Sequence, residues 1–142
     1  MAEASKPRPT FRNIHIFQIL QYRLPPAGIV SILHRVSGAL MFLLLPFIVW
    51  LLDVSLSSEI SYEQFTAAFG VGIGLVPGLL IKLVVLALIW AFLHHIIAGV
   101  RHLWMDMTHS VTKEQGHSSA IVTLASSVLL TVALGAKLFG LF

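Results

Sequence analysis

The chain has 142 residues, of which 57% are hydrophobic and only 11% are charged, and its formal net charge is +3. This composition excludes an ordinary soluble domain and indicates a membrane protein. The absence of cysteine excludes disulfides, thiolate zinc sites and iron–sulfur clusters held by this chain alone. We therefore expect membrane lipid around the chain and no nucleic-acid partner.

Residues 1–28 are predicted to form a cytoplasmic N-terminal arm. Segments rich in Lys and Arg tend to stay on the cytoplasmic side, and five basic residues lie in the arm or just after it: Lys6, Arg8, Arg12, Arg23 and Arg35. The arm has no signal-peptide cleavage site and lacks the composition of a transit peptide, which favours a bacterial inner membrane. Pro25 and Pro26 should end any helix in the arm and start the next one, because proline is tolerated in a first turn.

Three apolar stretches follow the arm, at about residues 29–52, 79–104 and 119–142. Their charge-free cores have 17, 18 and 22 residues, and about 20 helical residues cross a hydrocarbon core. Only a helix pairs all of its own backbone groups in lipid. We predict an all-α integral membrane protein with three transmembrane helices, up-down-up, in a single domain over 29–142.

The segments between these spans are predicted from their composition. LSSEISYEQFTAAF, residues 56–69, is expected to hold a short surface helix, and GVGIGLVPG a flexible entry to the second span. The connection from Asp53 to Pro77 has no Lys or Arg, which favours the side of the membrane away from the cytoplasm. The polar segment 107–119 is expected to be a turn.

Polar residues interrupt the second span in HHIIAGVRHLWMD, residues 94–106. Two neighbouring stripes of a helix carry them: His95, Gly99, His102 and Asp106 on one, and His94 and Arg101 on the other. An intramembrane histidine is costly and commonly functional, although a structural hydrogen bond to another helix is an open alternative. Gly99 offers room either for a flat cofactor beside His95 or for close helix packing. A buried neutral imidazole beside such a gap suits a haem ligand.

The first span carries a second polar cluster, SILHRVSG, residues 31–38. Ser31, Arg35 and Gly38 fall on one face of a helix, with His34 beside them. An unpaired arginine at the membrane centre costs roughly 2.5–3.5 kcal/mol, so an anionic or accepting group should lie nearby, unless the side chain snorkels to the surface. Both clusters lie at the cytoplasmic ends of their helices, which favours one shared site.

The patterns S-I-x-H-R-x-[ST]-G at residues 31–38 and H-x-x-x-G-x-R-H-x-x-x-D at 95–106 resemble a known family. The chain looks like the cytochrome b-type membrane-anchor subunit of succinate dehydrogenase, complex II. The resemblance extends over essentially the whole chain, including Arg8-Pro9 in the arm and Leu24-Pro25 before the first span. FRNIHIFQILQY in the arm departs from the family pattern, and we assign it no site role.

The resemblance implies that one haem b is bound between this chain and a second three-helix anchor subunit. Each anchor would supply one axial histidine, and the position that matches the ligand here is His95. His94 points about 100° away on a helix, and only the spacing to Gly99 and His102 selects His95 over it. The resemblance also makes His34 and His102 candidates for contacts with the haem propionates or with the ligand.

The resemblance further implies a ubiquinone site at the cytoplasmic end, against the iron–sulfur subunit, with Ser31 and Arg35 as this chain's contributions. A hydroxyl can donate to a quinone carbonyl oxygen, and a guanidinium can stabilise negative charge that develops on the quinone or on a propionate. Asp106 is a candidate for pairing with Arg101 or with the iron–sulfur subunit.

The expected function is that of a membrane-anchoring, haem b-binding subunit of succinate dehydrogenase that catalyses nothing alone. With its flavoprotein and iron–sulfur partners it would pass electrons from succinate oxidation to ubiquinone. The anchor of a quinol:fumarate reductase is an alternative of the same fold. Alternatives of other classes are a small proton-conducting or transport subunit that uses the second-span histidines and Arg101, and a structural anchor without haem.

Overall fold

The computed structural model describes residues 15–109 and 112–141, and helices make up most of them. They are α1 (Ile16–Gln21), α2 (Pro26–Ser57), α3 (Glu59–Gly70), α4 (Gly78–Thr108) and α5 (Lys113–Leu138). Three of these helices, α2, α4 and α5, are long and apolar enough to cross a membrane. The prediction of an all-α membrane protein with three spans is confirmed. Residues 1–14 of the predicted arm and Phe142 of the third predicted span lie outside the described residues.

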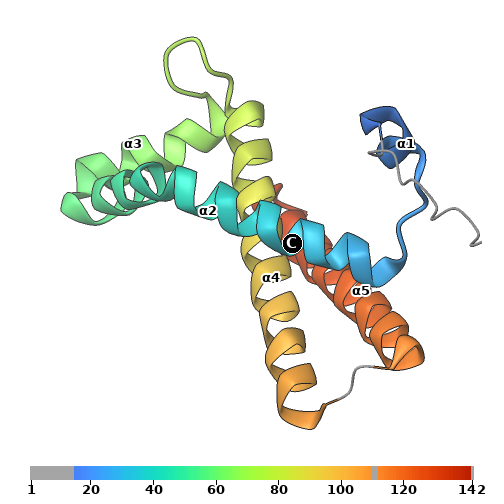
Figure 1. Ribbon diagram of the computed structural model, residues 1–142. Coiled ribbons are helices and arrows are strands. Elements are labelled where there is room, and N and C mark those ends of the chain that lie inside the picture. Colours follow the sequence, from blue (N-terminus) through green and yellow to red (C-terminus); the bar gives the residue numbers. More distant parts are fainter. Residues whose placement is uncertain (1–14, 110–111, 142) are drawn as a thin grey trace, which may run out of the picture.

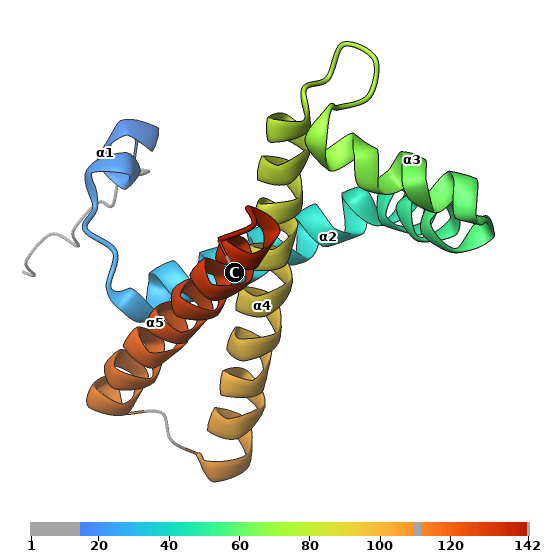
Figure 2. The same cartoon turned by 180° about the vertical axis from the view of Figure 1, so that it is seen from behind.

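Helix α4 is the centre of the arrangement, with contacts to α2, α3 and α5 (Figure 1). α2 crosses α4 near its middle, and α3 folds back along the second half of α2. α4 and α5 run in opposite directions and are joined by a short connection, whereas α1 stands apart from the long helices in both views (Figure 2). The crossing of α2 over α4 brings the two polar clusters of the sequence close together.

Small side chains fill the contacts between the helices. The buried apolar residues of the described chain are Val30, Ala68, Ala91, Ala98 and Ala120. Large apolar side chains such as Phe42, Leu43 and Leu129 point outward. This inverted distribution is typical of helices in lipid, where close backbone packing holds helices together and no water drives large side chains inward.

The helix ends follow local capping. Pro25 is the N-cap of α2 and Pro26 its first residue, as predicted. The predicted surface helix is confirmed as α3, whose N-cap Ser58 accepts a hydrogen bond from the backbone N–H of Ser61 at 3.1 Å. Ser61 Oγ in turn accepts from the backbone N–H of Ser58 at 2.9 Å, which completes a capping box.

Helix α5 begins at Lys113, so the prediction of a turn through residue 119 was wrong from there on. Thr112 Oγ1 accepts from the backbone N–H of Gln115 at 3.2 Å, and Gln115 Oε1 accepts from the backbone N–H of Thr112 at 3.3 Å. This reciprocal pair satisfies two otherwise free N–H groups and starts the helix in a polar segment. α5 ends at Leu138, a few residues before the predicted end of the span.

Candidate functional site: a histidine row between two crossing helices

His95 projects from α4 onto the backbone of α2. Its Nδ1 lies 3.0 Å from the carbonyl oxygen of His34 and 3.3 Å from Ser37 Oγ. A Cβ atom added to Gly38 would lie only 2.9 Å from Cε1 of the His95 ring. The imidazole is therefore seated directly against one turn of α2, where glycine leaves the space that it occupies.

The hydrogen bond to His34 defines the tautomer of His95. A carbonyl oxygen only accepts hydrogen bonds, so we assign the proton of the neutral imidazole to Nδ1. Nε2 then carries the free lone pair, and no described residue forms a hydrogen bond with it. A histidine held through Nδ1–H by a backbone carbonyl is the common arrangement for metal coordination through Nε2.

Two more histidines extend the site into a row. The His34 ring stacks on the His95 ring with centroids 4.2 Å apart and planes at 24°. The His102 ring lies 5.3 Å from that of His34, tilted by 40°. The structure therefore brings the polar clusters of the first two spans together through His34. A Cβ atom at Gly99 would meet only His34 Nε2, at 3.7 Å, so the open space at Gly99 adjoins His34.

His94 points away from the histidine row, into the contacts between this chain's own helices. It is fully buried, its Nδ1 lies 3.2 Å from Ser127 Oγ of α5, and Trp90 stacks on its ring at 5.3 Å. Its Nε2 has no hydrogen bond of good geometry within the described residues, although the backbone of Val30 on α2 is near enough to interact with the ring. All three long helices thus enclose this imidazole.

Arg101 lies on the same stripe as His94 and also faces α5. It is 8% exposed; its Nε donates to Ser119 Oγ at 3.0 Å, and Nη2 donates to the carbonyl oxygen of Gly116 at 3.2 Å. Asp106 was a candidate for pairing with Arg101 or with the iron–sulfur subunit, and the first of these pairings is not found among the described residues. The two residues are five positions apart, which turns their side chains about 140° away from each other around the helix, and Asp106 is exposed.

Ser31 and Arg35 lie on α2, one on either side of His34 in the chain. Ser31 is half-buried and Arg35 is exposed. Neither side chain forms a hydrogen bond or ion pair with another described residue. Both groups are therefore free to bind something outside the described part of the chain.

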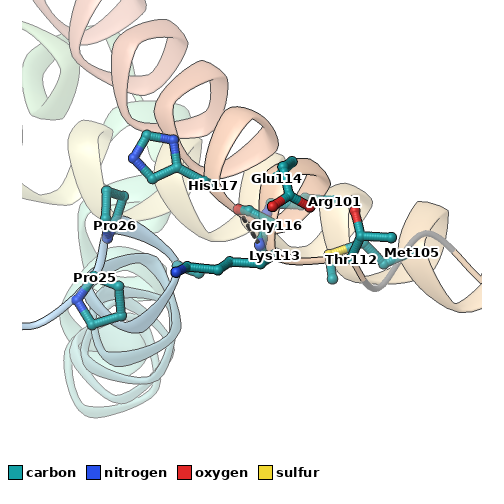
Figure 3. Close-up of a pocket in the computed structure, with 10 residues that line it drawn as sticks. Pro25, Pro26, Arg101, Met105, Thr112, Lys113, Glu114, Gly116 and His117 are labelled. Carbon is teal, nitrogen blue, oxygen red and sulfur yellow. Dashed lines mark hydrogen bonds between the residues drawn. The ribbon is translucent and has the colours of Figure 1, made fainter.

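A cavity of about 710 Å³ lies where the first turns of α2 and α5 meet the last turns of α4 (Figure 3). It is lined by Pro25, Pro26, Ala27, Arg101, Met105, Thr112, Lys113, Glu114, Gly116 and His117. Figure 3 shows Lys113 reaching from α5 toward the two prolines. The sequence interpretation missed Lys113 and His117, because it treated their segment as a turn; the Thr112–Gln115 capping pattern was the available signal.

Comparisons with known proteins agree on one family. Residues 5–134 match the model of the succinate dehydrogenase/fumarate reductase transmembrane subunit. The chain is 32% identical to the succinate dehydrogenase cytochrome b556 subunit of Paracoccus denitrificans over 111 residues, which covers 78% of this chain and 80% of the relative. It is also 32% identical over 117 residues to the subunit of that name from Coxiella burnetii, covering 82% of this chain and 89% of the relative.

Proposed function

The chain belongs to the succinate dehydrogenase/fumarate reductase transmembrane subunit family, and we propose that it is the haem b-binding membrane anchor of a succinate dehydrogenase. In this role it binds haem b and ubiquinone, and it helps to pass electrons from succinate oxidation to the quinone. One observation carries the haem assignment. The bond from His95 Nδ1 to the His34 carbonyl oxygen, at 3.0 Å, places the proton of the neutral imidazole on Nδ1 and leaves Nε2 available as a ligand.

The residues around His95 fit an axial haem ligand. His95 is only half-buried by its own chain, so its ring is open to a group shared with a second subunit. His34 and His102 lie in the same row and can contact the propionates. His94 does not fit this role, since its ring is fully enclosed by the chain. When bound, haem b supplies a one-electron relay.

Ser31 and Arg35 are the proposed quinone contacts. Neither residue lines the 710 Å³ cavity, but Ala27 does, and Ser31 follows it four residues later on the same face of α2. A volume of this size is within the usual range for small-molecule sites, roughly 300–1,000 Å³. Reduction of a quinone adds two electrons and two protons to its carbonyl oxygens. The Ser31 hydroxyl and the Arg35 guanidinium can donate to these oxygens and stabilise the negative charge that develops there.

The proposed assembly adds a flavoprotein, an iron–sulfur subunit and a second three-helix anchor to this chain. The large apolar side chains that point outward from α2 and α4 suit helix partners or lipid. The arm and the first turns of α2 carry five of the nine Lys and Arg residues, whereas the segment from Asp53 to Pro77 has none and carries Asp53, Glu59 and Glu63. This asymmetry supports a cytoplasmic N-terminus in a bacterial inner membrane.

The haem assignment is tested by a His95→Ala variant of the purified complex. We expect the reduced-minus-oxidised spectrum of low-spin b-type haem to disappear. His15→Ala, which removes an exposed histidine before α1, should leave the spectrum intact. A full haem spectrum in the His95→Ala complex would refute His95 as the ligand.

The quinone assignment is tested by Arg35→Ala. Succinate:quinone turnover should fall about 10-fold or more, because a charge-assisted donor to a reacting oxygen is lost. Succinate oxidation by an artificial soluble acceptor should stay near the wild-type rate. Arg23→Ala, which removes an exposed arginine of the arm, is the matched control. Equal loss in both assays would argue against a quinone contact at Arg35.

A further inference from the structure

Ser37 belongs to the first-span motif, but nothing in the expected chemistry gives it a task. It is fully buried, which is unusual for a hydroxyl on a helix surrounded by lipid and partner helices. Its Oγ donates to the carbonyl oxygen of His34 at 2.9 Å, and it lies 3.3 Å from His95 Nδ1. The hydroxyl thus touches both ends of the hydrogen bond that holds His95.

The hydrogen-bond donors and acceptors among His95 Nδ1, Ser37 Oγ and the His34 carbonyl oxygen can be assigned in one consistent way. The His34 carbonyl oxygen can only accept, so it accepts from His95 Nδ1–H at 3.0 Å and from the Ser37 O–H at 2.9 Å. If Nδ1 carried no proton, its lone pair would face the carbonyl lone pairs at that short distance. The Ser37 hydroxyl therefore competes with His95 for the same carbonyl oxygen, and its own Oγ is a weaker, longer second acceptor for Nδ1–H.

A shared acceptor bonds each donor less strongly than an unshared one. The strength of the Nδ1–H···O=C bond determines how much negative charge the imidazole carries, and hence how strongly Nε2 donates to a metal. A stronger bond stabilises the oxidised, more positive iron and lowers its reduction potential. The longer contact from Nδ1 to Ser37 Oγ acts in the opposite sense, but at 3.3 Å it is the weaker of the two effects.

We propose that Ser37 is a positioning residue that shares the His34 carbonyl oxygen with the axial His95 imidazole, weakens the hydrogen bond from His95 Nδ1–H and so raises the reduction potential of the haem. This inference rests on the proposed haem-binding function. Gly38 and the His34 ring also contact the His95 imidazole. The glycine lets the imidazole reach the backbone, and the His34 ring covers one of its faces. One turn of α2, residues 34–38, thereby holds the His95 side chain of α4 in place.

The test is a redox titration of haem b in the purified complex, followed by its optical difference spectrum. In Ser37→Ala we expect full haem content and a lower midpoint potential. Ser55→Ala is the matched control, since Ser55 lies on the same helix and donates to the Leu52 carbonyl oxygen at 2.8 Å with no histidine bonded to it. Its midpoint potential should equal that of the wild type. An unchanged or higher midpoint in Ser37→Ala overturns the proposal.

A second pair of variants separates the hydroxyl from side-chain shape. Ser37→Thr and Ser37→Val have nearly the same volume and differ in the hydroxyl alone. We expect the Thr variant to keep a midpoint close to the wild type and the Val variant to have a lower one. Equal midpoints, or equal loss of haem in both, would mean that Ser37 only fills space.

The outcome for His95→Ala keeps the two proposals apart. If that variant retains its haem, the ligand assignment fails whatever Ser37 does. If it loses its haem while Ser37→Ala and Ser37→Val keep the wild-type midpoint, His95 stands as the ligand and the role of Ser37 fails.

Discussion

His94 and His95 are neighbours in the chain but occupy opposite kinds of environment. His94 is fully buried among α2, α4 and α5, with its Nδ1 bonded to Ser127 and its ring stacked on Trp90. His95 is half-buried, and its Nδ1 is held by a backbone carbonyl while its Nε2 stays free. The difference teaches that an intramembrane histidine can serve either the fold or a bound group, and that the partner of its ring nitrogens distinguishes the two.

The same division continues along α4. The stripe of His94 and Arg101 is fastened to α5 through Ser127, Ser119 and the carbonyl of Gly116. The stripe of His95 and His102 faces α2. The first stripe thus holds α4 and α5 together with buried polar bonds, and the second leaves His95 Nε2 without a hydrogen bond to any described residue.

The largest effect on stability is expected from His94→Ala. Removal of a fully buried ring leaves a cavity and breaks the contacts with Trp90 and Ser127, which should lower the free energy of unfolding by roughly 2–5 kcal/mol. Thermal unfolding of the purified complex measures this loss. The fraction that stays folded should keep its full haem spectrum.

Two variants serve as checks on that result. Leu103→Ala, at an exposed position of α4, should change stability far less. His94→Gln keeps an amide that can bond Ser127, and it should be milder than His94→Ala. If His94→Ala had normal stability but lost the haem spectrum, His94 would be the ligand and the roles assigned to His94 and His95 would be exchanged.

The sequence predicts which residues share a stripe of α4 better than it predicts which helix each stripe contacts. Charge-free apolar runs predicted the three long helices, because backbone pairing in lipid allows little else. Helical periodicity also placed His95 with Gly99 and His102, and His94 with Arg101. The periodicity could not predict which stripe of α4 faces α2 and which faces α5. That orientation depends on which small residues pack between the helices, here Ala98 and Ala120.

The sequence did not predict the contacts of Arg101 or the packing of the His95 ring, and each has a physical reason. Arg101 was one of two candidate partners for Asp106, but side chains five positions apart point about 140° away from each other around a helix. The sequence pointed to Gly99 as room for a flat cofactor or for helix packing, but it gave no sign that Gly38, on another helix, makes room for the His95 ring. Contacts between helices far apart in sequence leave no periodic signal within either one.

An intermediate effect is expected from Gly38→Ala. The new Cβ would lie 2.9 Å from His95 Cε1, so the ring or the helix must shift, at a cost of about 1–3 kcal/mol. We expect a lower haem-to-protein ratio and a shifted absorption band in the haem that remains. Quantitative haem extraction and optical spectra measure both.

Gly99→Ala is the matched control within the same site. Its Cβ would meet only His34 Nε2, at an ordinary 3.7 Å, so the chain itself should accept it. If Gly38→Ala binds haem normally, the seating of His95 against α2 is wrong. If only Gly99→Ala loses haem, the bound group lies over Gly99.

The smallest effect is expected from Ser127→Ala, which removes the hydrogen-bond partner of His94 Nδ1 at 3.2 Å. Side-chain hydrogen bonds between membrane helices average about 0.6 kcal/mol, with a maximum near 1.7, so stability should fall by about that much, with no change in the haem spectrum. Ser126→Ala is the control, because its half-buried hydroxyl bonds only carbonyls of its own helix. A double-mutant cycle of Ser127→Ala with His94→Ala should be non-additive, since both changes remove one shared bond. Full additivity would mean that the α5 contact does not hold His94, and the contrast with His95 would then rest on burial alone.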